Sequence, residues 1–383
     1  MERSAAGGLW GLLAGLLAVA LACLEQEPTA LVELDLTPSP TAPLTPTTPT
    51  PAPTALPTPT PVCRDAALAE AAAAPATVQV VAGTTAGSGV VLWPEGRVLT
   101  AYHVVREHTL VVVLLPDGRR TAGTVAAWDE ASDLALVVLP LQGLTALSWA
   151  PGEPAPGTPV LALGYPLPSQ RGLGGRPTAA ATSSGRPTDI GGQRYIPLEA
   201  RLNEGYSGGP VVDLCGRLLG LVLARQGGGS DAALALSLAS ARPMAERLGR
   251  APPPALSPEQ SVLAANMVSS LQEGYLPSGR FVAVDAGQGQ ALFALHGICL
   301  DSPHSYCQKV LFFLGTRYLG TDTLRPSRAV LDVLPGQQPA EVIVVYANYL
   351  PGDPDCCPSA PPIPIPYLWD GGRLRPGGVP PGH

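Results

Sequence analysis

Short apolar runs separated by glycine and proline dominate the middle of the chain. Alternating and continuous runs occur at residues 78–81, 90–93, 110–115, 134–139, 160–163 and 218–224. Many short strands divided by turn residues are typical of antiparallel β architectures. We therefore expect residues 63–250 to form a mainly β domain.

The pattern changes after a proline-rich stretch at residues 251–256. Ser257, Pro258 and Gln260 predict a helix start, because the serine and glutamine can form a capping box and proline suits the first helical position. This helix is expected to run to about Gln272. Strand-like runs follow at residues 281–285, 291–295, 309–314, 329–333 and 341–346. Residues 251–383 are therefore expected to form a small α+β domain.

The amino terminus carries an apolar run at residues 9–22 that is short for a membrane span but of signal-peptide length. It ends in Ala20-Leu21-Ala22-Cys23, which resembles a bacterial lipobox. We expect residues 1–22 to be a signal peptide and Cys23 to receive a lipid that anchors the protein to the membrane. The alternative is an Ala-x-Ala site cut at the same bond, which would give a secreted protein. Residues 23–62 are rich in Thr and Pro and predict an extended tether.

Charge and cysteine content narrow the possible partners. The net charge is −7, which disfavours nucleic acid as a partner. Seven cysteines less one lipidated cysteine leave six, an even number that suits disulfides outside the cytoplasm. Cys215 is paired with Cys63 as a hypothesis, and disulfides are expected among Cys299, Cys307, Cys356 and Cys357. A metal site at His296, Cys299, His304 and Cys307 is the weaker alternative, so no metal or cofactor is expected.

One motif carries the chemistry of a nucleophilic enzyme. Ser207 is flanked by glycines in Gly205-Tyr206-Ser207-Gly208-Gly209-Pro210, and His103 and Asp133 each lie beside an apolar run. His103 can take the proton of the Ser207 hydroxyl, and Asp133 can hold the imidazole in the right tautomer. The N–H groups of Gly205 and Ser207 are expected to form an oxyanion hole. The glycines after the serine are expected to leave room for a substrate backbone.

Two residues compete for these roles. Asp129 is the alternative acid, but Asp133 is preferred because it directly opens the apolar strand. His108 lacks the sequence context of His103 and is expected at the surface.

These motifs resemble the trypsin-like serine peptidases of the HtrA/Deg type over about residues 76–250. The matching segments are Gly87–Val91, Leu99–Val105, Asp133–Leu136, Leu163–Pro166 and Asn203–Pro210. The resemblance implies two six-stranded β-barrels with the triad in the cleft between them. It also implies an extracytoplasmic endopeptidase acting on protein or peptide substrates. By alignment with that family, Leu202, Leu223 and Ala224 line an apolar specificity pocket, and Arg201 points outward.

The chain departs from the family in two places. Tyr206 stands before the nucleophile where the family usually has Asn, and no peptide-binding PDZ module is found after residue 250. Because a bulky neighbour can misplace the oxyanion donors, the alternative function is a catalytically inactive trypsin-fold binding protein of the cell envelope. Residues 258–375 instead resemble the LppP/LprE lipoprotein domain, through the segments Phe312–Thr321, Leu350–Ser359 and Tyr367–Gly371. That family brings no catalytic motif.

Overall fold

The computed structural model describes residues 65–166, 173–223, 233–300, 307–327, 329–354 and 357–381. The predicted signal peptide, the lipidation site at Cys23 and the tether lie outside these residues, as do Cys63, Ala224, His304 and Cys356. Within the described ranges, no helix combines the length and apolar character needed to cross a membrane.

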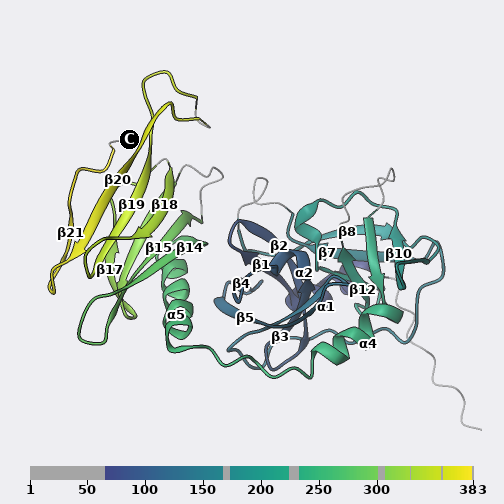
Figure 1. Cartoon of the computed structure of the whole chain (residues 1–383). Coiled ribbons are helices and arrows are strands. Elements are labelled where there is room, and N and C mark those ends of the chain that lie inside the picture. Colours follow the sequence, from purple (N-terminus) through teal and green to yellow (C-terminus); the bar gives the residue numbers. More distant parts are fainter. Residues whose placement is uncertain are drawn as a thin grey trace, which may run out of the picture. The chain divides into compact units, whose positions relative to one another are not determined.

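The first apolar runs form a closed antiparallel barrel, here called the first barrel (Figure 1). Its interior is filled by Val and Leu side chains from every strand. Val81, Val112 and Leu114 are buried in a separate cluster outside it, which explains why runs on these strands are continuous rather than alternating. Around the barrel the strands are β1 (Thr77–Ala82), β2 (Thr85–Trp93), β3 (Arg97–Ala101), β6 (Leu134–Val138), β5 (Arg120–Asp129) and β4 (Leu110–Leu114).

A second sheet, here called the second barrel, holds seven strands rather than the six expected. A short hairpin adds β9 beside β10, and an isolated antiparallel bridge between Ser184 and Leu198 joins the two sides of the sheet. In sheet order the strands are β8 (Thr178–Ser183), β7 (Pro159–Gly164), β11 (Pro210–Val212), β12 (Leu218–Leu223), β13 (Ala233–Ser237), β10 (Gln193–Leu198) and β9 (Thr188–Ile190).

Short helices accompany the two barrels. Helix α4 follows the last strand of the second barrel, and its end is held on the first barrel because Arg97 donates hydrogen bonds to the carbonyl oxygens of Gly249 and Ala251, at 2.5 and 2.9 Å. The helices are α1 (Ala66–Ala73), α2 (Tyr102–Val105) and α4 (Leu238–Leu248), with 3₁₀ turns η1 (Ala74–Ala76) and η2 (Glu204–Tyr206).

The carboxyl-terminal region combines one helix with two four-stranded antiparallel sheets. Helix α5 (Pro258–Gln272) begins at the predicted capping box, in which Ser257 and Gln260 exchange hydrogen bonds of 3.1 and 2.9 Å. The mainly β fold class, with a small α+β region at the end, is thus confirmed. One sheet contains β14 (Tyr275–Asp285), β15 (Ala291–Cys299), β16 (Gln308–Leu314) and β17 (Arg317–Thr321), and the other contains β18 (Val330–Pro335), β19 (Glu341–Asn348), β20 (Ala360–Trp369) and β21 (Leu374–Pro376).

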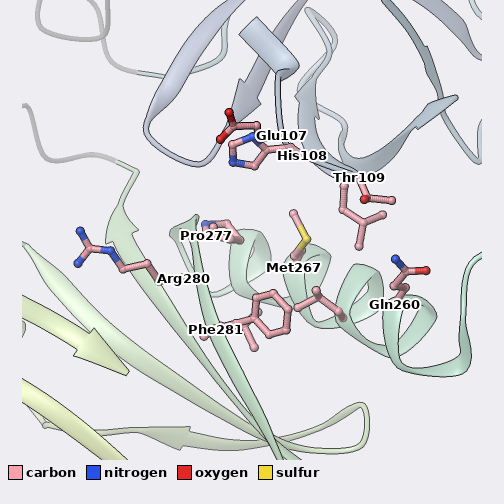
Figure 2. A pocket seen from close by; sticks show the side chains of 12 residues that line it. Glu107, His108, Thr109, Gln260, Met267, Pro277, Arg280 and Phe281 are labelled. Carbon is pink, nitrogen blue, oxygen red and sulfur yellow. The ribbon is translucent and has the colours of Figure 1, made fainter. Parts of the chain in front are cut away.

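The first of these sheets buries both faces. Leu292 and Ala294 face the second sheet, whereas Phe293 and Leu295 join the cluster beneath helix α5. The same cluster includes Val81, Val112 and Leu114 of the first barrel, and Arg120 donates a 3.1 Å hydrogen bond to the carbonyl of Leu271. A cavity of about 320 Å³ lies here, with Glu107 and His108 on one side and Met267 and Phe281 on the other (Figure 2).

His296 uses both of its ring nitrogens in hydrogen bonds within the carboxyl-terminal region. Its ring is buried, with Nδ1 hydrogen-bonded to the Ser278 hydroxyl at 2.6 Å and Nε2 to the Gln308 side chain at 3.0 Å. Cys299 forms a disulfide with Cys307, which confirms disulfide use in this region. Cys215 and Cys357 are also disulfide-bonded. The pairing of Cys215 with Cys63 stays a prediction, because Cys63 lies outside the described residues. Among the residues that the structure describes, no group of three His, Cys, Asp or Glu could hold a metal ion.

The buried histidine predicts a loss of stability in acid. Burial lowers the pKa of His296 from 6.5 to about 4. Between these values the unfolded chain binds a proton that the folded chain excludes, so stability is full above pH 6.5 and falls as the pH drops towards 4, by about 3 kcal/mol. Urea unfolding at pH 7, 5.5 and 4.5 should show this slope in the wild type and a weaker slope in His296→Gln. Equal slopes in the two proteins would contradict the assignment.

Candidate active site

The predicted base and acid lie in direct contact. His103 stands in helix α2, and its Nδ1 is hydrogen-bonded to Asp133 Oδ2 at 2.7 Å. The backbone N–H of His103 donates to Asp133 Oδ1 at 2.9 Å, so both carboxylate oxygens of Asp133 form hydrogen bonds with His103. The His103 side chain is 42% exposed. This is the arrangement that a histidine base needs from its orienting acid.

Local backbone geometry places Asp133 for this contact. Its φ is +53°, an uncommon conformation for a non-glycine residue, and its carbonyl accepts the N–H of Tyr102 at 3.0 Å. Asp129, the competing acid, instead binds Ser132 and Arg247. The preference for Asp133 over Asp129 as the partner of His103 therefore agrees with the geometry.

Ser207 lies in the segment that adjoins helix α2. A Cβ on Gly87 would lie 2.6 Å from a methyl of Val104 and 2.9 Å from the carbonyl oxygen of Ser207. Val104 and Ser207 therefore both pack against Gly87. Ser207 itself is only 2% exposed. Between the described residues His103 and Ser207 no hydrogen bond is formed in this conformation. Such bonds are often long without substrate and tighten in the complex.

Ser88 holds the nucleophile segment, a role that its sequence motif did not reveal. Its hydroxyl donates to the Gly205 carbonyl at 2.7 Å and accepts the N–H of Tyr165 at 2.9 Å. Its backbone N–H donates to the Ser207 carbonyl at 2.7 Å. The available sequence signal was a serine between two glycines at the start of an apolar run, and the structure shows this serine to be fully buried.

Removal of the Ser88 hydroxyl is expected to loosen this segment. Ser88→Ala leaves a buried carbonyl and a buried N–H without partners, which should cost about 1–3 kcal/mol of unfolding free energy. Urea unfolding measures the loss, and turnover of a short peptide should fall as well. The matched control is Ser184→Ala, a buried serine whose hydroxyl donates to the Ala155 carbonyl. A peptide turnover unchanged in Ser88→Ala would contradict the positioning role.

The glycines around the nucleophile accommodate the protein's own backbone. A Cβ on Gly205 would lie 1.9 Å from the Tyr165 carbonyl oxygen, and one on Gly209 would lie 2.1 Å from that of Leu163. Gly208 has φ +84°, where a side chain would also be strained. The expectation that Gly208 and Gly209 make room for a substrate backbone is therefore corrected, because they make room for neighbouring strands.

One expected oxyanion donor is occupied in this conformation. Glu204–Tyr206 forms a 3₁₀ turn, and the Ser207 N–H donates to the Glu204 carbonyl at 3.2 Å. For Gly205 and Ser207 to form the predicted oxyanion hole, the Glu204 carbonyl must rotate away from the Ser207 N–H. The oxyanion hole therefore stays a prediction.

Tyr206 does not fill the cleft. Its side chain is buried in the core of the second barrel, against Gly164, where a Cβ would lie 2.7 Å from the tyrosine ring. Leu202 packs on the same cluster, whereas Leu223 is 1% exposed and belongs to the other core cluster. Arg201 is exposed, as expected. Ala224 lies outside the described residues, so the pocket of Leu202, Leu223 and Ala224 remains a prediction.

Comparison with known proteins identifies the class of the fold and site. Residues 87–221 match the family described as trypsin-like peptidase domain, and residues 294–372 match LppP/LprE lipoprotein. The chain therefore carries a trypsin-like peptidase domain followed by an LppP/LprE lipoprotein domain.

Curated relatives place the peptidase domain beside HtrA/DegP-like serine proteases. The chain is 31% identical over 212 residues to the "Putative serine protease HhoB" of Synechocystis sp., covering 52% of this chain and 50% of that protein. It is 27% identical over 245 residues to the "Probable periplasmic serine endoprotease DegP-like" of Brucella suis, covering 58% and 47%. The chain thus spans about half the length of these relatives.

Among solved structures, the active form of the Rv3671c protease from M. tuberculosis is 27% identical, with a TM-score of 0.43. The match covers 52% of this chain and 95% of that one.

Proposed function

We propose that this protein is an extracytoplasmic serine endopeptidase that hydrolyses peptide bonds in exposed or unfolded protein segments. The observation that carries the proposal is the His103–Asp133 pair, held by two hydrogen bonds beside the segment of Ser207. The homology to serine proteases described as periplasmic supports both the reaction and the compartment.

The proposed reaction follows from these groups. The Ser207 hydroxyl attacks the substrate carbonyl while Nε2 of His103 takes its proton. Asp133 keeps Nδ1 protonated and stabilises the imidazolium that forms. His103 then returns the proton to the leaving amine, and water hydrolyses the acyl-enzyme. Before attack, the Glu204 carbonyl must release the Ser207 N–H, so that this donor and that of Gly205 can stabilise the oxyanion.

Labelling with a fluorophosphonate probe tests the proposal. The folded full chain should be labelled on Ser207 and should cleave an unfolded protein, and excess peptide substrate should slow labelling. The binding-protein alternative rests on the occupied Ser207 N–H. Peptide binding without labelling or cleavage by the folded protein would reject the endopeptidase and support that alternative.

We further propose that Cys23 carries a lipid that anchors the protein outside the cytoplasm. The LppP/LprE lipoprotein match supports this, together with the sequence before Cys23. Cys23→Ser is expected to move the protein from the membrane fraction to the soluble fraction of bacterial cells. Mass spectrometry of the mature amino-terminal peptide provides the direct measurement, and an unmodified Cys23 would contradict the anchor.

A further inference from the structure

A cavity in the carboxyl-terminal domain has the chemistry of a ligand site and takes no part in the proposed catalysis. It has a volume of about 380 Å³, within the range of small-molecule sites. It opens where the edge strands β17 and β21 of the two sheets flank β20. The lining residues that matter here are Arg317, Tyr318, Thr321, Tyr367, Trp369 and Arg373.

Arg317 is held in place without a countercharge. Its guanidinium lies 5.5 Å from the centre of the Trp369 ring, and no ion pair to it is formed by the residues that the structure describes. Stacking on an aromatic face fixes the plane of a guanidinium and leaves its N–H edge free to bind a carboxylate in bidentate fashion. Trp369 is buried, with 8% of the residue exposed, so its ring supports the arginine rather than presenting a face to solvent.

The second arginine at the cavity adds to a surplus of positive charge. Arg373 and Arg375 share the single carboxylate of Asp370, and the Arg373 contact measures 3.8 Å. Backbone N–H groups of Arg373 and Gly372, with the Arg375 side chain, lower the pKa of Asp370 to about 2, so it is ionised. One carboxylate cannot neutralise both arginines. An anion is therefore favoured here, although the chain as a whole is acidic.

The floor of the cavity is polar and already ordered. Asp322 is buried, and its carboxylate accepts hydrogen bonds from the Tyr346 hydroxyl at 2.6 Å and the Val310 N–H at 3.0 Å. The Tyr367 hydroxyl donates to the Asp322 carbonyl at 3.1 Å. Burial raises the pKa of Tyr318 to about 12, so its phenol stays neutral and can donate. Hydroxyl groups on this floor suit a ligand with hydroxyls of its own.

We propose that this cavity binds an acidic sugar, with its carboxylate on Arg317 and its hydroxyls on the tyrosine and threonine side chains of the floor. Arg373 supplies the second cation. An acidic peptide offers the same carboxylate, but it lacks the hydroxyls that would match the polar floor. The site is independent of the peptidase reaction.

Calorimetric titration of the full chain with glucuronate tests the site. Glucose is the control sugar that lacks the carboxylate, and a capped aspartate is the control that carries the carboxylate on a peptide unit. Glucuronate should bind at least about tenfold more tightly than glucose, because hydrogen bonds between a guanidinium and a carboxylate are stronger than those to a neutral hydroxyl. Arg317→Gln should weaken glucuronate binding by about tenfold or more, and Arg373→Gln by a smaller factor. The matched control Arg325→Gln, an exposed arginine of the same domain outside the lining, should change it by less than about twofold.

Thermal unfolding of each variant verifies that it is folded. Undetectable glucuronate binding, equal affinity for glucose, or unchanged affinity in both Arg317→Gln and Arg373→Gln would overturn the site. If the capped aspartate bound more tightly than glucuronate, the cavity would be a peptide site and the proposal would be wrong. If the fluorophosphonate probe did not label the wild-type protein, the glucuronate affinities would still test the cavity. The two proposals can therefore fail separately.

Discussion

Ser207→Ala is expected to lower kcat for an unfolded protein substrate by about 10⁶-fold while the fold remains intact. Removal of the nucleophile of a triad removes almost all covalent catalysis, and the residual rate comes from binding and the oxyanion donors. The substitution keeps the Cβ and both backbone hydrogen bonds of Ser207, which are made by its N–H to Glu204 and by its carbonyl to Ser88. The unfolding free energy should therefore stay close to that of the wild type.

Cleavage of a fluorescently labelled unfolded protein measures the rate, and fluorophosphonate labelling should vanish in the same variant. Ser184→Ala is the matched control, because that serine is equally buried but lies in the second barrel, bonded to the Ala155 carbonyl. It should keep its activity. Substantial cleavage by purified Ser207→Ala would mean that Ser207 is not the nucleophile, and the proposed serine endopeptidase mechanism would be wrong.

The contact between His103 and Asp133 was predictable from the sequence because both residues lie next to regular strands. His103 follows strand β3, and Asp133 precedes strand β6, which pairs with β3 so that Ala101 lies opposite Leu134. Two residues beside adjacent strand ends are close whatever the rest of the chain does. That is why local motifs sufficed for this half of the site.

The oxyanion geometry could not be predicted in the same way. Whether the Glu204 carbonyl points towards or away from the Ser207 N–H depends on one peptide plane. Glycine at position 205 permits both orientations, so the sequence is compatible with either. The role of Ser88 was hidden for a related reason, since its partners Gly205 and Tyr165 are distant in sequence.

In the carboxyl-terminal domain, strand β20 escaped prediction because it is rich in proline. Pro361, Pro362, Pro364 and Pro366 suggest a loop, since proline cannot donate to a sheet. In the structure β21 pairs only with Tyr367–Trp369, so the proline-containing part has a single neighbour, β19. An edge position tolerates the missing donors, and sequence alone does not reveal which strands become edges.

Asp133→Asn should lower kcat by about 10⁴-fold with a small effect on KM. The carboxylate accepts both the backbone N–H and the ring Nδ1 of His103. An asparagine that keeps the bond from the backbone N–H presents its NH₂ group to Nδ1. This favours the tautomer whose Nε2 carries the proton and cannot act as a base. Because Asp133 is partly exposed and its backbone bond to Tyr102 is retained, the variant should fold.

Asp129→Asn provides the matched control for this prediction. Asp129 ends strand β5 four residues before Asp133, and it contacts Ser132 and Arg247 rather than His103. Its loss should reduce stability modestly and leave kcat within about threefold of the wild type, since exposed ion pairs contribute little. Steady-state kinetics on a short peptide compares the two variants at equal folded concentration. If Asp129→Asn lost activity and Asp133→Asn kept it, the acid would be reassigned, and the pairing seen with His103 would have to be a resting arrangement.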